Sequence, residues 1–277
     1  MITFHLFRIR LEEKADLFAD TSKTKAEIIK EAVDEKPSRE IRKGQVWKIG
    51  NVEPIGTEGL FFAFGKITKS TREVYDESGG NFIEEDLEEC PYTYVMVDLR
   101  FQVCAIAKKT KIAQSPKPVG SNLAKLLDAS DVAVSNSIKF SIAPISDPAE
   151  FLTLIKDAKI ISRFEIEFSP PNPFDAEKDF HAPMEKFLQV TGGFKGATTI
   201  EGNNLDSGVL VEVVRSAAAT GNEAKAWIKS SDDQKPVKKL LSGNDTTVTV
   251  ATLATTEKKS KLFEAIRKAY QSIRGSG

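Results

Sequence analysis

A chain of 277 residues with 40% hydrophobic and 29% charged residues can bury a substantial core, as one large domain or two of ordinary size. No stretch approaches the roughly 20 apolar residues that a transmembrane helix needs, so the sequence predicts none. The formal net charge of −1 neither favours nor excludes a polyanionic partner.

Charge is distributed unevenly along the chain. Residues 1–100 hold 15 Lys/Arg against 20 Asp/Glu (net −5), residues 101–200 hold 12 against 11 (net +1), and residues 201–277 hold 12 against 9 (net +3). From Lys225 onward the count is 11 against 5, a net of +6. An acidic start and a basic end are typical of proteins that bind nucleic acid or acidic surfaces, although ordinary charge scatter also produces them.

The N-terminus and the cysteines indicate a cellular compartment. The opening MITFHLFRIRLEEK alternates like a strand and has no apolar core of a signal peptide. Two cysteines, Cys90 and Cys104, are few for a chain of this length and favour a reducing environment. We therefore expect a cytoplasmic protein.

The first half of the chain is rich in predicted strands. Alternating or β-branched runs predict strands over residues 2–10, 45–55, 60–70, 92–99 and 101–108. Weaker helical patterns follow potential caps, with helices over about 25–35 and from Ser121 to Ser130. The polar, acidic stretch 76–89 is predicted to be a loop.

The second half mixes strands and helices up to residue 196. Strands are predicted over 138–145 and 159–169, and Asp147 is predicted to cap a helix that has Pro148 at its first position. The prolines of 170–173 predict a turn, and a helix is expected over about 175–190. A glycine-rich connection, 192–196, follows.

The stretch 199–241 predicts a helix that leads into a basic hairpin. Asn203, Asn204 and Asp206 are suitable helix N-caps, and Gly221 tolerates the positive φ of a helix end. Apolar residues then recur at helical spacing from Leu205 to Ala217. After the glycine the period changes to strand alternation over 224–229, followed by a turn over 230–233 and an extended run over 236–241.

A β-branched strand over 246–252 and a charged helix from Glu257 to about Ile273 complete the predicted elements. Because the strands arrive in runs rather than in strict βα alternation, the fold class is predicted to be α+β, with mixed or antiparallel sheets and segregated helices. We expect an acidic, strand-rich N-terminal domain over 1–130 and an α+β C-terminal domain over 131–277.

Most catalytic signatures are missing. The four possible zinc ligands His5, His181, Cys90 and Cys104 have no finger or ribbon spacing, and there is no nucleophile elbow. The glycine-rich run 192–196 lacks the Gly-Lys-Ser/Thr ending of a phosphate-binding loop. The acidic run 84–89 is either a solvated loop or a segment that binds a divalent cation or imitates nucleic-acid phosphates. The sequence predicts neither a cofactor nor a metal site.

One enzymatic alternative remains. Metal-dependent nucleases place an Asp and a Glu-x-Lys on neighbouring strands, so that carboxylates hold Mg²⁺ near the attacking water. Glu223-Ala224-Lys225 has this spelling, and its partner acid would be Asp206 or Glu212. Both of these acids lie in a predicted helix or its cap.

The lysines of the C-terminal third suggest a phosphate-binding surface. Such a surface neutralises backbone phosphates and binds largely without regard to sequence, whereas a solvated charged hairpin is the simpler interpretation. Trp227 lies on the lysine face by alternation, where it either packs beneath lysine stems or stacks on an unpaired base. The candidate residues are Lys225, Lys229, Lys235, Lys238, Lys239, Lys258, Lys259, Lys261, Arg267 and Lys268.

The stretch Thr199-Ile200-Glu201-Gly202, two asparagines, Leu205-Asp206-Ser207, an apolar helix, a lysine-bearing hairpin and a final charged helix resembles the RexA family of phage exclusion proteins. The KwaB proteins of the Kiwa anti-phage systems are similar in layout. The order of elements is similar over about residues 45–274, and individual residues match only around 199–241. The resemblance implies a cytoplasmic, homodimeric, non-enzymatic protein of phage defence that binds double-stranded DNA and signals to a membrane protein encoded nearby.

Three functions therefore remain open. The first is largely sequence-independent DNA binding in a bacterial exclusion system, and the second is a metal-dependent nuclease using Glu223 and Lys225. The third is a protein-interaction subunit that binds no nucleic acid, for which the acidic segment 84–89 is the part to test.

Overall fold

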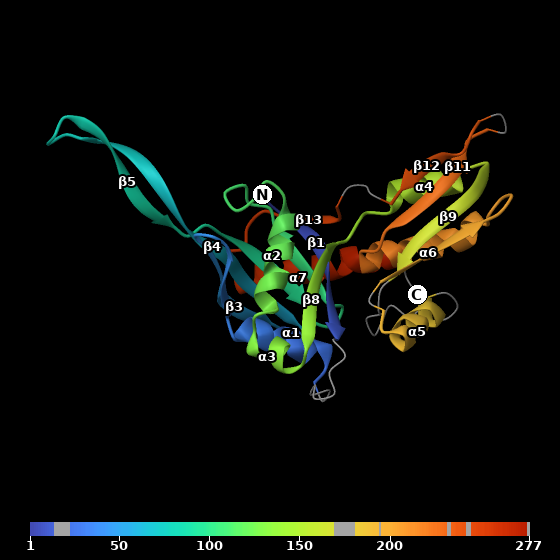
Figure 1. Ribbon diagram of the computed structural model, residues 1–277, viewed down its shortest axis with the longest axis horizontal. Coiled ribbons are helices and arrows are strands. Elements are labelled where there is room, and N and C mark those ends of the chain that lie inside the picture. Colours follow the sequence, from blue (N-terminus) through green and yellow to red (C-terminus); the bar gives the residue numbers. More distant parts are fainter. Residues whose placement is uncertain (14–22, 169–180, 194, 232–233, 242–244, 276–277) are drawn as a thin grey trace.

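Two antiparallel sheets form the framework of the fold (Figure 1). The computed structural model describes residues 1–13, 23–168, 181–193, 195–231, 234–241 and 245–275. Within those ranges the strands form one sheet of nine strands and one of four, and each strand pairing is antiparallel. The predicted α+β class is confirmed, with strands concentrated in the N-terminal half.

The large sheet is organised around the first strand of the chain. Its order is β13 (Thr247–Val250), β1 (Ile2–Glu13), β7 (Val103–Ala107), β6 (Tyr92–Asp98), β4 (Gly59–Asp76), β3 (Gln45–Ile55) and β2 (Ser38–Arg42). Two strands lie off this path: β8 (Ile138–Pro144) pairs with β1, and β5 (Asn81–Glu89) pairs with β4. Along β1, residues 2–5 pair with β13 and residues 7–13 pair with β8.

The two sheets do not divide the chain at residue 130. Both β8 and β13 come from the second half of the chain, yet they pair with β1 in the large sheet. The predicted domains 1–130 and 131–277 therefore each contribute strands to the same sheet.

Helices cover both faces of the large sheet. Alternate β1 residues point to opposite sides, so Phe7, Ile9 and Leu11 pack with apolar residues of α1 (Lys25–Asp34), α2 (Pro116–Leu127) and α3 (Asp131–Ser135). Phe4 and Leu6 belong to the opposite core, which contains the buried face of α7 (Thr256–Arg274).

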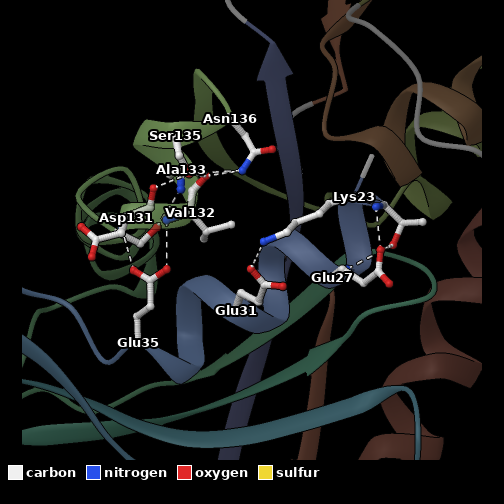
Figure 2. Close-up of polar contacts among 11 residues, drawn as sticks. Lys23, Glu27, Glu31, Glu35, Asp131, Val132, Ala133, Ser135 and Asn136 are labelled. Atoms are coloured by element: carbon white, nitrogen blue, oxygen red, sulfur yellow. Dashed lines mark hydrogen bonds and ion pairs between the residues drawn. The ribbon is translucent and has the colours of Figure 1, made fainter. Parts of the chain in front are cut away.

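Side chains cap both ends of α1, and the cap at its C-terminal end also joins it to the short α3 (Figure 2). Thr24 and Glu27 form a capping box at the start of α1. At the other end of α1, the Glu35 carboxylate accepts hydrogen bonds from the backbone N–H groups of Asp131 and Val132, at 2.6 and 2.9 Å (Figure 2). These N–H groups have no partner within a helix, so the carboxylate from α1 satisfies them.

The small sheet shares a core with the large one. Its order is β10 (Gly196–Glu201), β9 (Ile160–Phe168), β11 (Ala224–Lys229) and β12 (Val237–Leu240). One face packs against α4 (Ala149–Lys156) and α6 (Ser207–Thr220), and this core continues through α7 to the large sheet. The helix α5 (His181–Thr191) contacts β9.

The acidic stretch 76–89 was predicted to be a loop, and that prediction is wrong. The strand β4 continues to Asp76, and residues 81–89 form β5, so the two strands make a long hairpin. The turn is stabilised locally, because the Asp76 carboxylate accepts from the Ser78 N–H at 2.9 Å and Gly80 adopts a positive φ. Nearly every side chain of β5 is exposed, and a ribbon with two wet faces carries no apolar alternation for sequence analysis to detect.

Smaller differences involve helix starts and short strands. The helix predicted from Ser121 begins at Pro116, since proline needs no N–H partner in the first turn. Three short elements (β2, α3 and β10) were not predicted. The predicted turn 170–173, the start of the predicted helix 175–190, and Asp232 and Asp233 of the predicted turn 230–233 lie outside the described residues.

Candidate nucleic-acid interface

The helix α6 positions the lysine-bearing strand β11. Asp206 caps the helix, accepting from the N–H groups of Gly208 and Val209, as the sequence predicted. Gly221 ends it in the left-handed region, with φ of 69°, and the chain then reverses into β11. Ala224, Ala226 and Ile228 are buried in the core that contains α6. The alternating residues of β11, including Lys225, Trp227 and Lys229, therefore lie on the open face of the sheet.

Lys225 is held by an acid from the neighbouring strand. Its Nζ lies 2.5 Å from Oε1 of Glu165, directly opposite on β9. The hydrogen bond to Lys225 lowers the pKa of Glu165, and the same bond raises the pKa of Lys225. The charge of Lys225 is thus largely compensated within the sheet. The two residues are 60 apart in the sequence, so the pair could not be predicted from sequence neighbours.

Other acids of β9 and β10 reduce the positive potential of this face. Glu167 pairs with Lys195 at 2.8 Å, and Glu201 pairs with Arg163 at 3.4 Å. The open face is a mixed surface, since β9 places Glu165 and Glu167 beside the lysines of β11. The alternation of β9 is visible in the sequence, but its pairing with β11 is not.

Trp227 packs beneath cationic side chains. The Arg163 guanidinium lies 4.6 Å from the centre of a Trp227 ring, and Lys238 Nζ lies 5.3 Å from it. Both are within the range of cation–π attraction. Of the two arrangements predicted for Trp227, the described structure has the one in which it packs beneath charged stems.

Lysines of the β11–β12 hairpin point to both faces of the sheet. Lys238 lies opposite Trp227 on the open face, whereas Lys239 lies opposite Ala226 and emerges at the edge of the helix-covered face. Lys235 and Lys238 are exposed, and Lys229 and Lys239 are partly exposed. None of these four lysines makes an ion pair with an acid in the described part of the chain. We refer to Lys229, Lys235, Lys238 and Lys239 as the hairpin lysines.

Two of the candidates on α7 are structural. Arg267 donates from Nε to Asp98 and from Nη2 to Glu58, each at 2.8 Å, and its charge partners raise its pKa. Lys259 Nζ lies 2.6 Å from Glu53 Oε2. Both side chains hold α7 against the large sheet, and their charged groups are engaged in these ion pairs.

The remaining candidates on α7 are exposed. Lys261 pairs with Glu257 on its own helix, while Lys258 and Lys268 point to solvent. The α7 group lies over the large sheet, whereas the hairpin lies at the far end of the small sheet (Figure 1). The structure thus brings together the hairpin lysines but distributes the α7 cations over a separate region.

The nuclease arrangement is not assembled around Glu223. Glu223 and Lys225 lie on the open face, whereas Asp206 and Glu212 belong to α6 on the opposite face. Asp206 already serves as the helix cap. Among the described residues, no group of three or more His, Cys, Asp or Glu side chains is arranged to hold a metal ion.

The Glu165–Lys225 pair predicts a pH dependence of stability. A lowered Glu pKa stabilises the fold above the ordinary value of about 4.3, and this contribution is lost as pH falls through the folded-state pKa. A raised Lys pKa stabilises the fold below about 10.4, and this contribution is lost as pH rises through the folded-state pKa. We expect Lys225→Met to lower the urea midpoint at pH 7, and the difference from wild type to shrink as pH falls below about 4.3.

The exposed pair Lys261–Glu257 supplies the control for that measurement. Lys261→Met is expected to change the midpoint little at any pH, because exposed pairs contribute little. A difference between wild type and Lys225→Met that does not shrink at any pH below about 4.3 would contradict a role for the charge pair.

No protein-family model matches this chain, and no curated protein sequence matches it either. Across the described residues, no helix combines the length and the apolar character required to cross a bilayer.

Proposed function

We propose that this chain binds double-stranded DNA through its phosphate backbone, using the hairpin lysines. The observation that carries the proposal is that four lysines within residues 229–239 extend from both faces of one hairpin without an ion pair to a described acid. The same stretch contains Asp232 and Asp233, so its net charge is +2 (four Lys minus two Asp). Cations arranged in this way attract phosphates by releasing counterions and read no base sequence.

The open face beside the hairpin limits where DNA can lie. Glu165, Glu167 and Glu201 repel phosphates, so the duplex is expected to run along the edge strand β12 rather than across the whole sheet. Trp227 is covered by Arg163 and Lys238, which favours duplex binding over stacking on unpaired bases.

A mobility shift with a duplex of random sequence, titrated in salt with EDTA present, tests the proposal. Binding is expected at about 50 mM salt, with log affinity falling by about 0.9 for each phosphate contact per log unit of salt. Four contacts give a slope of roughly −3 to −4. Absence of binding at low salt would refute the proposal.

Incubation with plasmid and Mg²⁺ or Mn²⁺ separates binding from cleavage. The binding-only proposal expects no cleavage. Cleavage that Glu223→Gln abolishes would replace it with the nuclease hypothesis.

The wider role that we propose, in bacterial phage exclusion with a homodimer and a membrane-protein partner, is supported by the resemblance at residues 199–241. Its test is phage plating on cells with and without the gene and its neighbours. Unchanged plating efficiency across a phage panel would count against it.

A further inference from the structure

The β4–β5 hairpin extends away from the body of the protein as an isolated two-stranded arm (Figure 1). We define the arm as residues 69–88. It contains two cations and seven acids, a net charge of −5. Among the strands that the structure describes, β5 pairs with β4 alone. An isolated two-stranded ribbon is only marginally stable in water, so an arm of this length gains stability from a partner.

The pairing register gives the arm two different faces. One face carries an apolar group, formed by Val74 opposite Ile83 together with Leu87. The other face, which we call the acidic face, carries four acids, one lysine and an aromatic pair. Its cross-strand pairs are Lys69 with Glu88, Thr71 with Asp86, Glu73 with Glu84, and Tyr75 with Phe82.

Two features of the acidic face are unfavourable in the isolated chain: a pair of like charges and an exposed aromatic side chain. Glu73 and Glu84 lie directly opposite each other, and like charges in that position destabilise a strand pair. At the tip, Phe82 is 83% exposed and contacts Tyr75, which is 54% exposed, at a centroid distance of 5.1 Å. A partner that supplies cations and an apolar contact would remove both costs.

The chain itself carries a surface of that chemistry. The hairpin lysines flank the edge strand β12, whose Leu240 (48% exposed) lies on the open face with Lys238. Val237 (52% exposed) lies on the opposite face with Lys239. The arm and the β11–β12 hairpin lie at opposite ends of the molecule (Figure 1), so an arm cannot reach the hairpin of its own chain.

We propose that the acidic face of the arm binds the β11–β12 hairpin of a second copy of this chain. Acidic residues of the arm meet the hairpin lysines, and Phe82 packs on Leu240 beside Lys238 on the open face. In a two-fold arrangement the contact is made twice, because each copy contributes one arm and one hairpin. The inference uses the lysines of the proposed DNA interface, so DNA is expected to compete with the arm.

Charge reversal on the arm can be made without harming the ribbon. In Glu73→Lys/Asp86→Lys, the new lysine at 73 faces Glu84, and position 86 faces the neutral Thr71. The acidic face changes from a net −3 (one Lys, four acids) to +1 (three Lys, two acids). The reciprocal variant is Lys235→Glu/Lys238→Glu. Each double variant is expected to be monomeric alone, and their equimolar mixture is expected to associate.

Sedimentation velocity without DNA provides the measurement. Wild type is expected to associate at about 50 mM salt and to dissociate as salt rises, because the contact is charged. Phe82→Ser is expected to weaken the association about tenfold, as loss of a central aromatic contact does. The control Glu77→Lys/Glu89→Lys makes the same change in charge, with position 89 facing the neutral Thr68, and leaves the acidic face intact, so it is expected to associate.

Three results would overturn the inference. They are a monomeric wild type at low salt, an arm variant that associates like wild type, and a mixture of the two reversed variants that stays monomeric. Because DNA is absent from the measurement, association does not depend on the outcome of the mobility shift. Circular dichroism of each variant identifies any loss of folding.

Discussion

Replacing Arg267 with alanine is expected to lower the free energy of unfolding by about 3–5 kcal/mol. The Arg267 guanidinium is 17% exposed and lies between Asp98, which is 1% exposed, and Glu58. Removing the cation leaves a buried carboxylate without its charge partner, and this is costly because the carboxylate stays desolvated. The measurement is urea unfolding at neutral pH, followed by tryptophan fluorescence.

The control for Arg267→Ala is Lys261→Ala on the same helix. Lys261 and Glu257 form an exposed i,i+4 pair, so this variant is expected to lose no more than about 0.5 kcal/mol. Equal destabilisation by the two variants would mean that the Asp98 pair contributes nothing beyond an ordinary surface contact.

Reversing the charge of all four hairpin lysines is expected to reduce the affinity for duplex DNA at least about 100-fold at low salt. Each lysine that contacts a phosphate contributes to the salt dependence, so the log–log slope is expected to fall by about 3–4. The variant is Lys229→Glu/Lys235→Glu/Lys238→Glu/Lys239→Glu. Lys225 is left unchanged, because breaking its pair with Glu165 would confuse binding with stability.

A second fourfold variant tests whether position matters as well as net charge. Lys43, Lys108, Lys111 and Lys125 are exposed and lie outside the hairpin. Their replacement by glutamate makes the same change in net charge, and affinity is expected to fall much less. Equal loss in the two variants would show that the net charge of the chain, rather than the hairpin, determines binding.

The sequence predicted those parts of the fold that carry a local signal. Strand alternation at 45–55 and 159–169 located β3 and β9, and Asp206 and Gly221 marked the limits of α6, because caps and periodicity are properties of neighbouring residues. The arm was missed because both of its faces are wet and its residues resemble those of a loop.

The candidate site was predicted less completely, because the ion pairs that engage several of its cations join residues that are remote in sequence. Arg267, Lys259 and Lys225 were all named as candidate phosphate-binding residues, yet each pairs with an acid that is distant in sequence: Asp98, Glu53 and Glu165. An ion pair between remote strands depends on sheet order and register, and neither can be read from one strand alone. The hairpin lysines differ because the fold brings no described acid into an ion pair with any of them.

The position of β1 has a consequence for the order in which the chain folds. This strand leaves the ribosome before its partners β8 and β13, and the core face that contains Phe4 and Leu6 is completed by α7. Until residues beyond 250 have been made, Phe4, Leu6, Phe61 and Met96 lack the helix that completes their core. Contacts between residues this remote in sequence form slowly, and until they form the apolar side chains stay exposed to solvent. We therefore expect the nascent chain to bind chaperones that recognise apolar segments until α7 has emerged.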